Sequence, residues 1–231
     1  MEKMGQHISR QYQAELAHIQ SQVLRMGGLV EVQVKNAVQA LLDSDTELAD
    51  QVLEADDAVN DLEVNIDAEC TQIVARRQPA ASDLRLIMGV IKTISDLERI
   101  GDESKRIARM AKPDQSYLLP DHICMEINYM SELANGILHD VLDSFARLNA
   151  ESALEIAKRD HRVDLKFESI TRQLITYMMQ DSKTIPVSLS VMWAARALER
   201  IGDRSQNIAE HIIYLVRGED VRHVPLDDFL E

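Results

Sequence analysis

One hexapeptide occurs twice in the chain: Leu-Glu-Arg-Ile-Gly-Asp stands at 97–102 and recurs unchanged at 198–203. The agreement extends to both sides, with Ile107 and Ala108 matched by Ile208 and Ala209, and with Asp56, Val59 and Asn60 matched more loosely by Asp160, Val163 and Asp164. An identity of this length within one short chain indicates duplication of a structural unit. We therefore expect two copies of one unit, each ending in the hexapeptide.

Apolar residues recur every three or four positions between the prolines, which is the pattern of amphipathic helices. Aromatic residues make up only 4% of the chain, and 8 Gly and 5 Pro are too few for a turn-rich β fold. The sequence therefore predicts an all-α protein. Its helices are expected at about 7–43, 46–77, from Pro79 to 112, 121–149, 152–181, and from Pro186 to 218.

Helices of this length are about 45 Å long and, when joined by short links, pack as antiparallel neighbours. The sequence predicts a first three-helix bundle at 1–112, a second at 120–218, and an acidic flexible tail at 219–231. Trp193 falls on the apolar face of the last helix and is expected in the core. His161 and His211 are expected at the surface.

The net charge of −14 disfavours direct contact with nucleic acid, whose phosphates would be repelled. The 2 Cys stand alone in the sequence, without metal-binding or disulfide spacing, as is usual in a reducing compartment. We find neither a signal-peptide pattern nor an apolar run long enough to span a membrane. A cytoplasmic protein without membrane insertion is the expectation.

The repeated carboxylates allow two interpretations. Glu98 and Asp102 are four residues apart and share one helix face, as do Glu199 and Asp203. They could form salt bridges, for example between Arg196 and Glu199. They could also bind a hard cation, because oxygen ligands suit Mg²⁺, Mn²⁺, Ca²⁺ or iron. Spacing alone leaves both interpretations open.

Six segments then identify a resemblance. On the residues at 26–31, 75–87, 96–108, 138–148, 172–179 and 197–210, the chain resembles the PhoU family over about 5–223. The resemblance implies two three-helix bundles with pseudo-twofold symmetry, a homodimer in the cytoplasm, and no enzymatic activity. It further implies a negative regulator of the phosphate regulon and of phosphate uptake, acting in signal transduction. Its expected partners are the ATPase subunit of the phosphate ABC transporter and the phosphate-sensing histidine kinase.

The resemblance also implies metal sites at paired acidic residues. In this sequence they fall on Glu98, Asp102, Glu199, Asp203, Asp160, Asp164 and Asp56, and Asn60 replaces the acid expected beside Asp56. The implied cations are Mg, Mn, Fe or Zn. A carboxylate-bridged metal enzyme or a metal-storage bundle is the alternative; it would need a second pair like Glu15 and His18, which the sequence lacks. A metal-free helical adaptor is the other alternative. No residue set predicts a dedicated phosphate pocket.

Overall fold

The computed structural model describes residues 2–111, 120–157, 159 and 161–222, with side chains from residue 10 onward. These residues contain no strand, and the all-α prediction is confirmed. The helices are α1 (Glu2–Asp43), α2 (Thr46–Arg77), α3 (Ala81–Ala108), α4 (Asp121–Arg147), α5 (Ala150–Ala157), α6 (His161–Gln180) and α7 (Ile185–Arg217), with a short 3-10 turn η1 (Ser182–Thr184) before α7.

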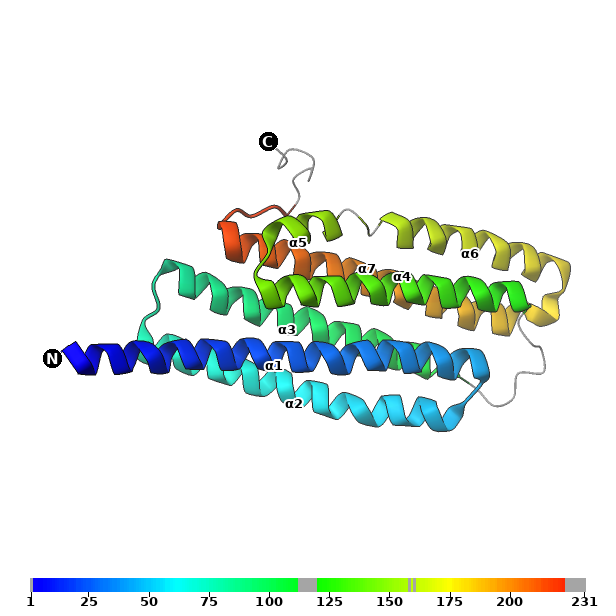
Figure 1. The fold of residues 1–231 in the computed structure, drawn as a ribbon. Coiled ribbons are helices and arrows are strands. Elements are labelled where there is room, and N and C mark those ends of the chain that lie inside the picture. The colour runs from blue at the N-terminus through cyan, green and yellow to red at the C-terminus, as the bar shows by residue number, and fades with distance from the viewer. Residues whose placement is uncertain (1, 112–119, 158, 160, 223–231) are drawn as a thin grey trace.

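The helices form two units of the same order, lying side by side in an elongated molecule (Figure 1). In the first unit α1, α2 and α3 pack against one another; in the second, α4, α5 and α6 surround α7. The helices α3 and α7, which carry the hexapeptide, form the most extensive contact between the two units. The duplication predicted from the sequence is therefore confirmed in the fold.

Several helix boundaries differ from the prediction, among them the start of α1, which is Glu2 rather than about 7. The expected helix over 152–181 is two helices, α5 and α6, which follow each other along α7 (Figure 1). Five consecutive polar residues, 158–162, interrupt the apolar period of the sequence there, which weakens the amphipathic pattern that stabilises one continuous helix. The third helix ends at Ala108 rather than near 112, which lies outside the described residues.

Short local signals set the helix ends. Asp45 begins α2, where its carboxylate accepts a hydrogen bond of 3.0 Å from the amide of Leu48. Gly218 ends α7 with φ +78°, a left-handed conformation that glycine adopts without steric cost. Of the predicted tail, Val221 is buried in the core, and 223–231 lie outside the described residues.

The buried apolar side chains form one cluster that includes both units. Gly27 lies where α1 meets α4, and a Cβ at this position would come within 2.5 Å of the Leu142 side chain. Its lack of a side chain lets the first helices of the two units approach closely. No helix in the described ranges combines the length and apolarity needed to cross a membrane.

Two side-chain predictions are wrong. Trp193 is 62% exposed, although it continues the apolar period of α7. His211 is only 9% exposed and lies between α7 and α3. Both residues lie along the contact between the repeated helices, and periodicity within one helix does not show where its partner helix covers it.

Candidate functional site

The two hexapeptides meet in an antiparallel helix pair. Along α3 from Asp96 to Glu103, the partners on α7 run in the opposite direction, from His211 to Arg200. Further along, Arg109 lines the same hollow as Trp193. This register places the first hexapeptide beside the second, and Asp102 and Asp203 line one hollow.

In the first unit, a lysine lies between the acidic residues. The Nζ of Lys105 is 2.5 Å from Oδ2 of Asp56 on α2 and 2.7 Å from Oδ1 of Asp102 on α3. Asn60 also donates to Asp56, over 2.9 Å. The side chain of Asp56 is only 4% exposed, so the ammonium compensates a buried negative charge.

Gly101 makes this arrangement possible. A Cβ at this position would lie 3.1 Å from Oδ1 of Asp56 and 3.2 Å from Oε1 of Gln33. Glycine in the middle of a helix usually destabilises it by about 1 kcal/mol relative to alanine. Here the missing side chain lets two polar groups from α1 and α2 contact the α3 backbone directly.

Glu98 lies beside this cluster without sharing the ammonium. Burial raises the pKa of Glu98, and the neighbouring charges of Asp102 and Glu63 raise it further. The first unit therefore brings Asp56 and Asp102 together on one lysine, and leaves Glu98 as a carboxylate whose charged form is disfavoured.

The second unit lacks this lysine. Gln206 stands at the position that corresponds to Lys105. Glu199 pairs with Arg196 over 2.6 Å, as the sequence predicts, but its other carboxylate oxygen is buried and has no hydrogen-bond partner in the described part of the chain. Burial raises the pKa of Asp203, and the charge of Asp164 raises it further. Asp160 lies outside the described residues.

The two units therefore differ in how well they fit a cation. Within the described residues, no three acidic, histidine or cysteine side chains are grouped to hold a metal ion. In the first unit the ammonium of Lys105 already occupies the space between the carboxylates of Asp56 and Asp102, so these residues do not fit a metal. In the second unit the carboxylates of Glu199, Asp203 and Asp164 repel one another electrostatically, which a bound cation would relieve.

Some of these contacts were missed at the sequence level. Arg106 pairs with Glu103 over 2.8 Å. The contact between Lys105 and Asp102 spans three residues of one helix and could have been found from spacing. The contact with Asp56 joins α2 to α3, and only the packing of these two helices reveals it.

A second polar cluster lies between α3 and α7, next to the start of the first hexapeptide and beyond the end of the second. The Nε2 of His211 is 3.0 Å from Oδ2 of Asp96, and Arg204 and Asn207 approach the other oxygen at 3.4 and 3.5 Å. Asp96 is 6% exposed. These residues join the two units by a buried polar contact.

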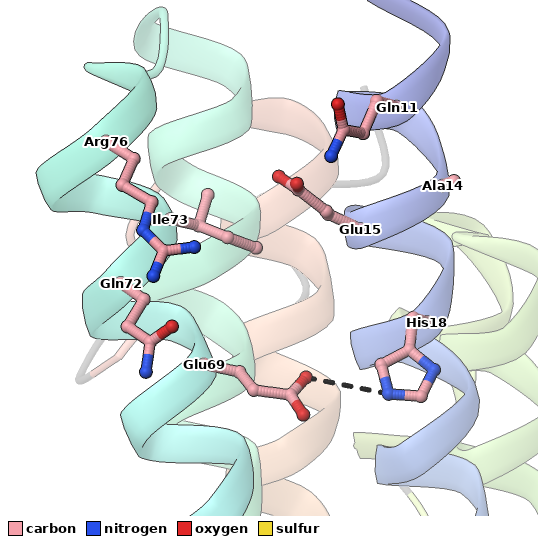
Figure 2. Close-up of a pocket in the computed structure, with 8 residues that line it drawn as sticks. All are labelled: Gln11, Ala14, Glu15, His18, Glu69, Gln72, Ile73 and Arg76. Atoms are coloured by element: carbon pink, nitrogen blue, oxygen red, sulfur yellow. Dashed lines mark ion pairs between the residues drawn. The ribbon is translucent and has the colours of Figure 1, made fainter.

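A hollow of about 350 Å³ lies between the first half of α1 and the last half of α2 (Figure 2). It contains Glu15 and His18, the pair with the spacing of a di-iron ligand set. Glu15 binds Arg77 at 2.8 Å, and His18 lies 3.7 Å from Glu69. With Glu15 held by an arginine, this hollow has no ligand set for a metal in the described structure.

The fold and the twin acidic helices define a class: all-helical proteins built from a duplicated three-helix unit, with paired carboxylates on the last helix of each copy. Comparison with known proteins places the chain within this class. The family model for the PhoU domain matches at 23–111 and again at 127–212. The chain belongs to the PhoU family.

Individual relatives agree with this assignment. The chain is 49% identical over 225 residues to a phosphate-specific transport system accessory protein PhoU homolog of Pseudomonas putida, covering 97% of this chain and 88% of the relative. It is 47% identical over 227 residues to the phosphate-specific transport system accessory protein PhoU of Escherichia coli, covering 97% and 93%.

Solved structures agree as well. The crystal structure of PhoU from Pseudomonas aeruginosa superposes with a TM-score of 0.84 at 47% identity, over 90% of this chain and 100% of the other. The phosphate transport system regulatory protein PhoU from Streptococcus pneumoniae gives a TM-score of 0.84 at 30% identity, over 91% and 99%. The resemblance predicted from the sequence is confirmed, and with it a regulatory role associated with phosphate transport.

Proposed function

We propose that this protein is a cytoplasmic negative regulator of the phosphate regulon and of phosphate uptake. It relays the state of the phosphate ABC transporter, through the transporter's ATPase subunit, to the phosphate-sensing histidine kinase. The observation that carries the proposal is the extent of similarity to accessory proteins of the phosphate-specific transport system, which covers 97% of this chain and both repeats.

The proposed mechanism is a change in the populations of conformational states, caused by binding of a partner protein and not by catalysis. A partner that binds one arrangement of the two units more tightly than another changes their populations in proportion to that difference. The buried contact between α3 and α7 supports this mechanism, because it links the two units through polar groups that a relative movement would separate. We propose no enzymatic step.

Deletion of the gene tests this role. In phosphate-rich medium the deletion strain should express its phosphate-responsive phosphatase, and the wild-type gene should restore repression. Co-purification should recover the transporter ATPase and the kinase with the tagged protein. Unchanged phosphatase expression in the deletion strain would contradict the proposal.

A divalent or iron cation at the second unit is a further part of the proposal. The residues that would hold it are Glu199, Asp203 and Asp164, with Asp160 beside them in the sequence. The raised pKa values of Glu199 and Asp203 support it, because a cation favours the charged form of both carboxyl groups. When bound, the cation would supply a fixed positive charge that joins α6 to α7.

Metal analysis of the purified protein tests this part. After supplementation with Mg²⁺, Mn²⁺, Fe²⁺ or Zn²⁺, we expect one site per chain, lost in the Glu199→Ala/Asp203→Ala variant and kept in Glu98→Ala. If no cation is bound after supplementation, the proposed metal site is contradicted and these carboxylates have a structural role only. We also propose a homodimer, for which light scattering should give twice the chain mass of 26.1 kDa.

A further inference from the structure

An arginine-lined groove runs along the contact between α3 and α7. Two adjoining hollows of about 410 and 250 Å³ form it, and Glu103, Arg106, Arg196 and Arg200 line both. The basic groove is defined by six arginines: Arg99 and Arg106 on α3, Arg109 directly after it, and Arg196, Arg200 and Arg204 on α7. Only three carboxylates line the same hollows, so the groove is positive in a chain whose net charge is −14.

Its arginines are partly open to solvent. The side chains of Arg106, Arg196 and Arg200 are 52%, 44% and 42% exposed. Arg106 and Arg200 share a single carboxylate oxygen of Glu103, at 2.8 and 3.3 Å. Two guanidinium groups on one carboxylate retain donors for further anionic groups, since each guanidinium carries five N–H bonds.

One end of the basic groove is apolar. The smaller hollow is lined there by Trp193, Met110 and Ala197. Trp193 is 62% exposed, and Leu189 and Ile185, one and two turns earlier on α7, are 43% and 39% exposed. An exposed tryptophan grouped with a half-buried methionine and with arginine side chains is typical of protein interfaces.

The duplication explains why only one end is open. Asp96 and Ala197 occupy corresponding positions before the hexapeptides, and His211 and Met110 correspond after them. At one end Asp96 and His211 form a buried contact of 3.0 Å. At the other end an alanine and a methionine replace this pair, no polar contact forms between them, and the smaller hollow remains.

We propose that the basic groove is the docking site for an acidic, amphipathic helical segment of a partner protein. Carboxylates of the segment would bind the arginines, and an apolar side chain would fill the hollow beside Trp193. From Arg99 to Arg109 the groove extends about 15 Å along α3, which is about three helical turns. This inference rests on the proposed function only in that the protein acts through protein contacts.

Other anionic ligands fit less well. A single phosphate ion would contact only part of a row of arginines spread over three turns, and it would leave the apolar end unused. A nucleic acid would be repelled by the net charge of −14 outside the groove. Charge and apolar surface together match a polypeptide that carries both.

Trp193 is the only tryptophan in the sequence, so its fluorescence reports on the groove directly. The probe is a synthetic peptide of about 15 residues with Glu and Leu at helical spacing. Titration into the full chain should shift the Trp193 emission to shorter wavelength and saturate. The peptide with Gln in place of Glu should bind at least tenfold more weakly, and added salt should weaken the Glu peptide.

Matched variants locate the binding. Arg99→Gln/Arg109→Gln should weaken peptide binding at least tenfold, and this pair leaves the contacts of Glu103 in place. Arg147→Gln/Arg172→Gln removes the same charge from exposed positions elsewhere and should bind the peptide as the wild type does. Circular dichroism should show that all variants fold. Equal binding by the groove variant and the control variant would overturn the proposal.

Further titrations distinguish the peptide from other ligands that could bind in the groove. A saturating Trp193 response to inorganic pyrophosphate, or to vesicles of anionic phospholipid, with none to the peptide, would overturn the proposal. So would a Trp193 emission that shifts with protein concentration alone, because a second copy would then cover the groove. The deletion experiment does not depend on the peptide titration. A negative result for peptide binding would therefore contradict the docking site without contradicting the regulatory role.

Discussion

The imidazole of His211 on α7 binds the buried carboxylate of Asp96 on α3 over 3.0 Å, and these two residues belong to different copies of the repeated unit. Neither the spacing of the histidines nor that of the acids indicates this contact. It lies on the far side of the hexapeptides from Trp193, and it gives the interface between the units a polar, closed end.

Replacing His211 with Phe should destabilise the fold by about 1–3 kcal/mol, because Asp96 loses a hydrogen bond in a buried position. Urea unfolding measures the change. His122→Phe, at an exposed position of α4, is the matched control and should change little. Equal stability of the two variants would show that Arg204 and Asn207 suffice to satisfy Asp96.

Replacing Lys105 with Met should lower the free energy of unfolding by about 3 kcal/mol, because Asp56 would keep a buried charge without its ammonium. The second change Asp56→Asn should recover much of this loss, since it removes the stranded charge. Chemical unfolding of the two single variants and the double variant measures the coupling. Additive losses would contradict the shared ion pair.

Two glycine replacements should have opposite effects. Gly28→Ala should stabilise the protein by about 1 kcal/mol, because nothing lies within 4 Å of the added Cβ and alanine favours the helix. Gly101→Ala should instead destabilise it, because its Cβ would crowd Asp56 and Gln33 at 3.1 and 3.2 Å. We expect the two thermal midpoints to lie on opposite sides of the wild-type value.

Asp203→Asn should stabilise the metal-free protein near neutral pH. The folded state raises the pKa of Asp203 above its ordinary value of 3.8, mainly through partial desolvation of a side chain that remains exposed, and further through the charge of Asp164. The folded protein therefore holds this proton more tightly than the unfolded chain, and stability falls as pH rises from 3.8 through the raised pKa.

The gain from Asp203→Asn should accordingly be full above that raised pKa and shrink as the solution is acidified toward 3.8. Thermal unfolding at several pH values, in the presence of a chelator, measures it. The matched control is Asp57→Asn, at an exposed position of α2, which should show no such pH-dependent gain. A destabilised Asp203→Asn variant at neutral pH would contradict the electrostatic argument.

Local patterns predicted much of this structure. The apolar period located α1 and α2 within a few residues, except at the start of α1, and the repeated hexapeptide predicted the duplicated unit. The pairing of Arg196 with Glu199 followed from their spacing on one helix. Contacts between helices were beyond such reasoning, as Lys105 and Asp56 show: they are 49 positions apart and meet only because α2 and α3 pack in one particular register.

Trp193 is a second case in which a local pattern did not predict how the helices pack. Its position on α7 is apolar by period, but the indole borders the smaller hollow beside Arg109 and Met110 and is 62% exposed. The repeated hexapeptide makes Asp102 and Asp203 look equivalent, and the residue three positions later, Lys105 in one copy and Gln206 in the other, is the sequence signal that distinguishes them. Asp102 contacts the ammonium of Lys105, whereas desolvation and the charge of Asp164 raise the pKa of Asp203.

Because both copies of the unit belong to a single polypeptide, the two ends of the contact between α3 and α7 can differ chemically. Two separate identical subunits related by a twofold axis would have to present the same chemistry at both ends of their shared seam. Because the two copies are encoded separately within one chain, each can differ in sequence from the other. One end of the α3–α7 contact has the hydrogen bond between Asp96 and His211, and the opposite end has Ala197 and Met110. An assembly partner can therefore approach such a chain in one orientation only.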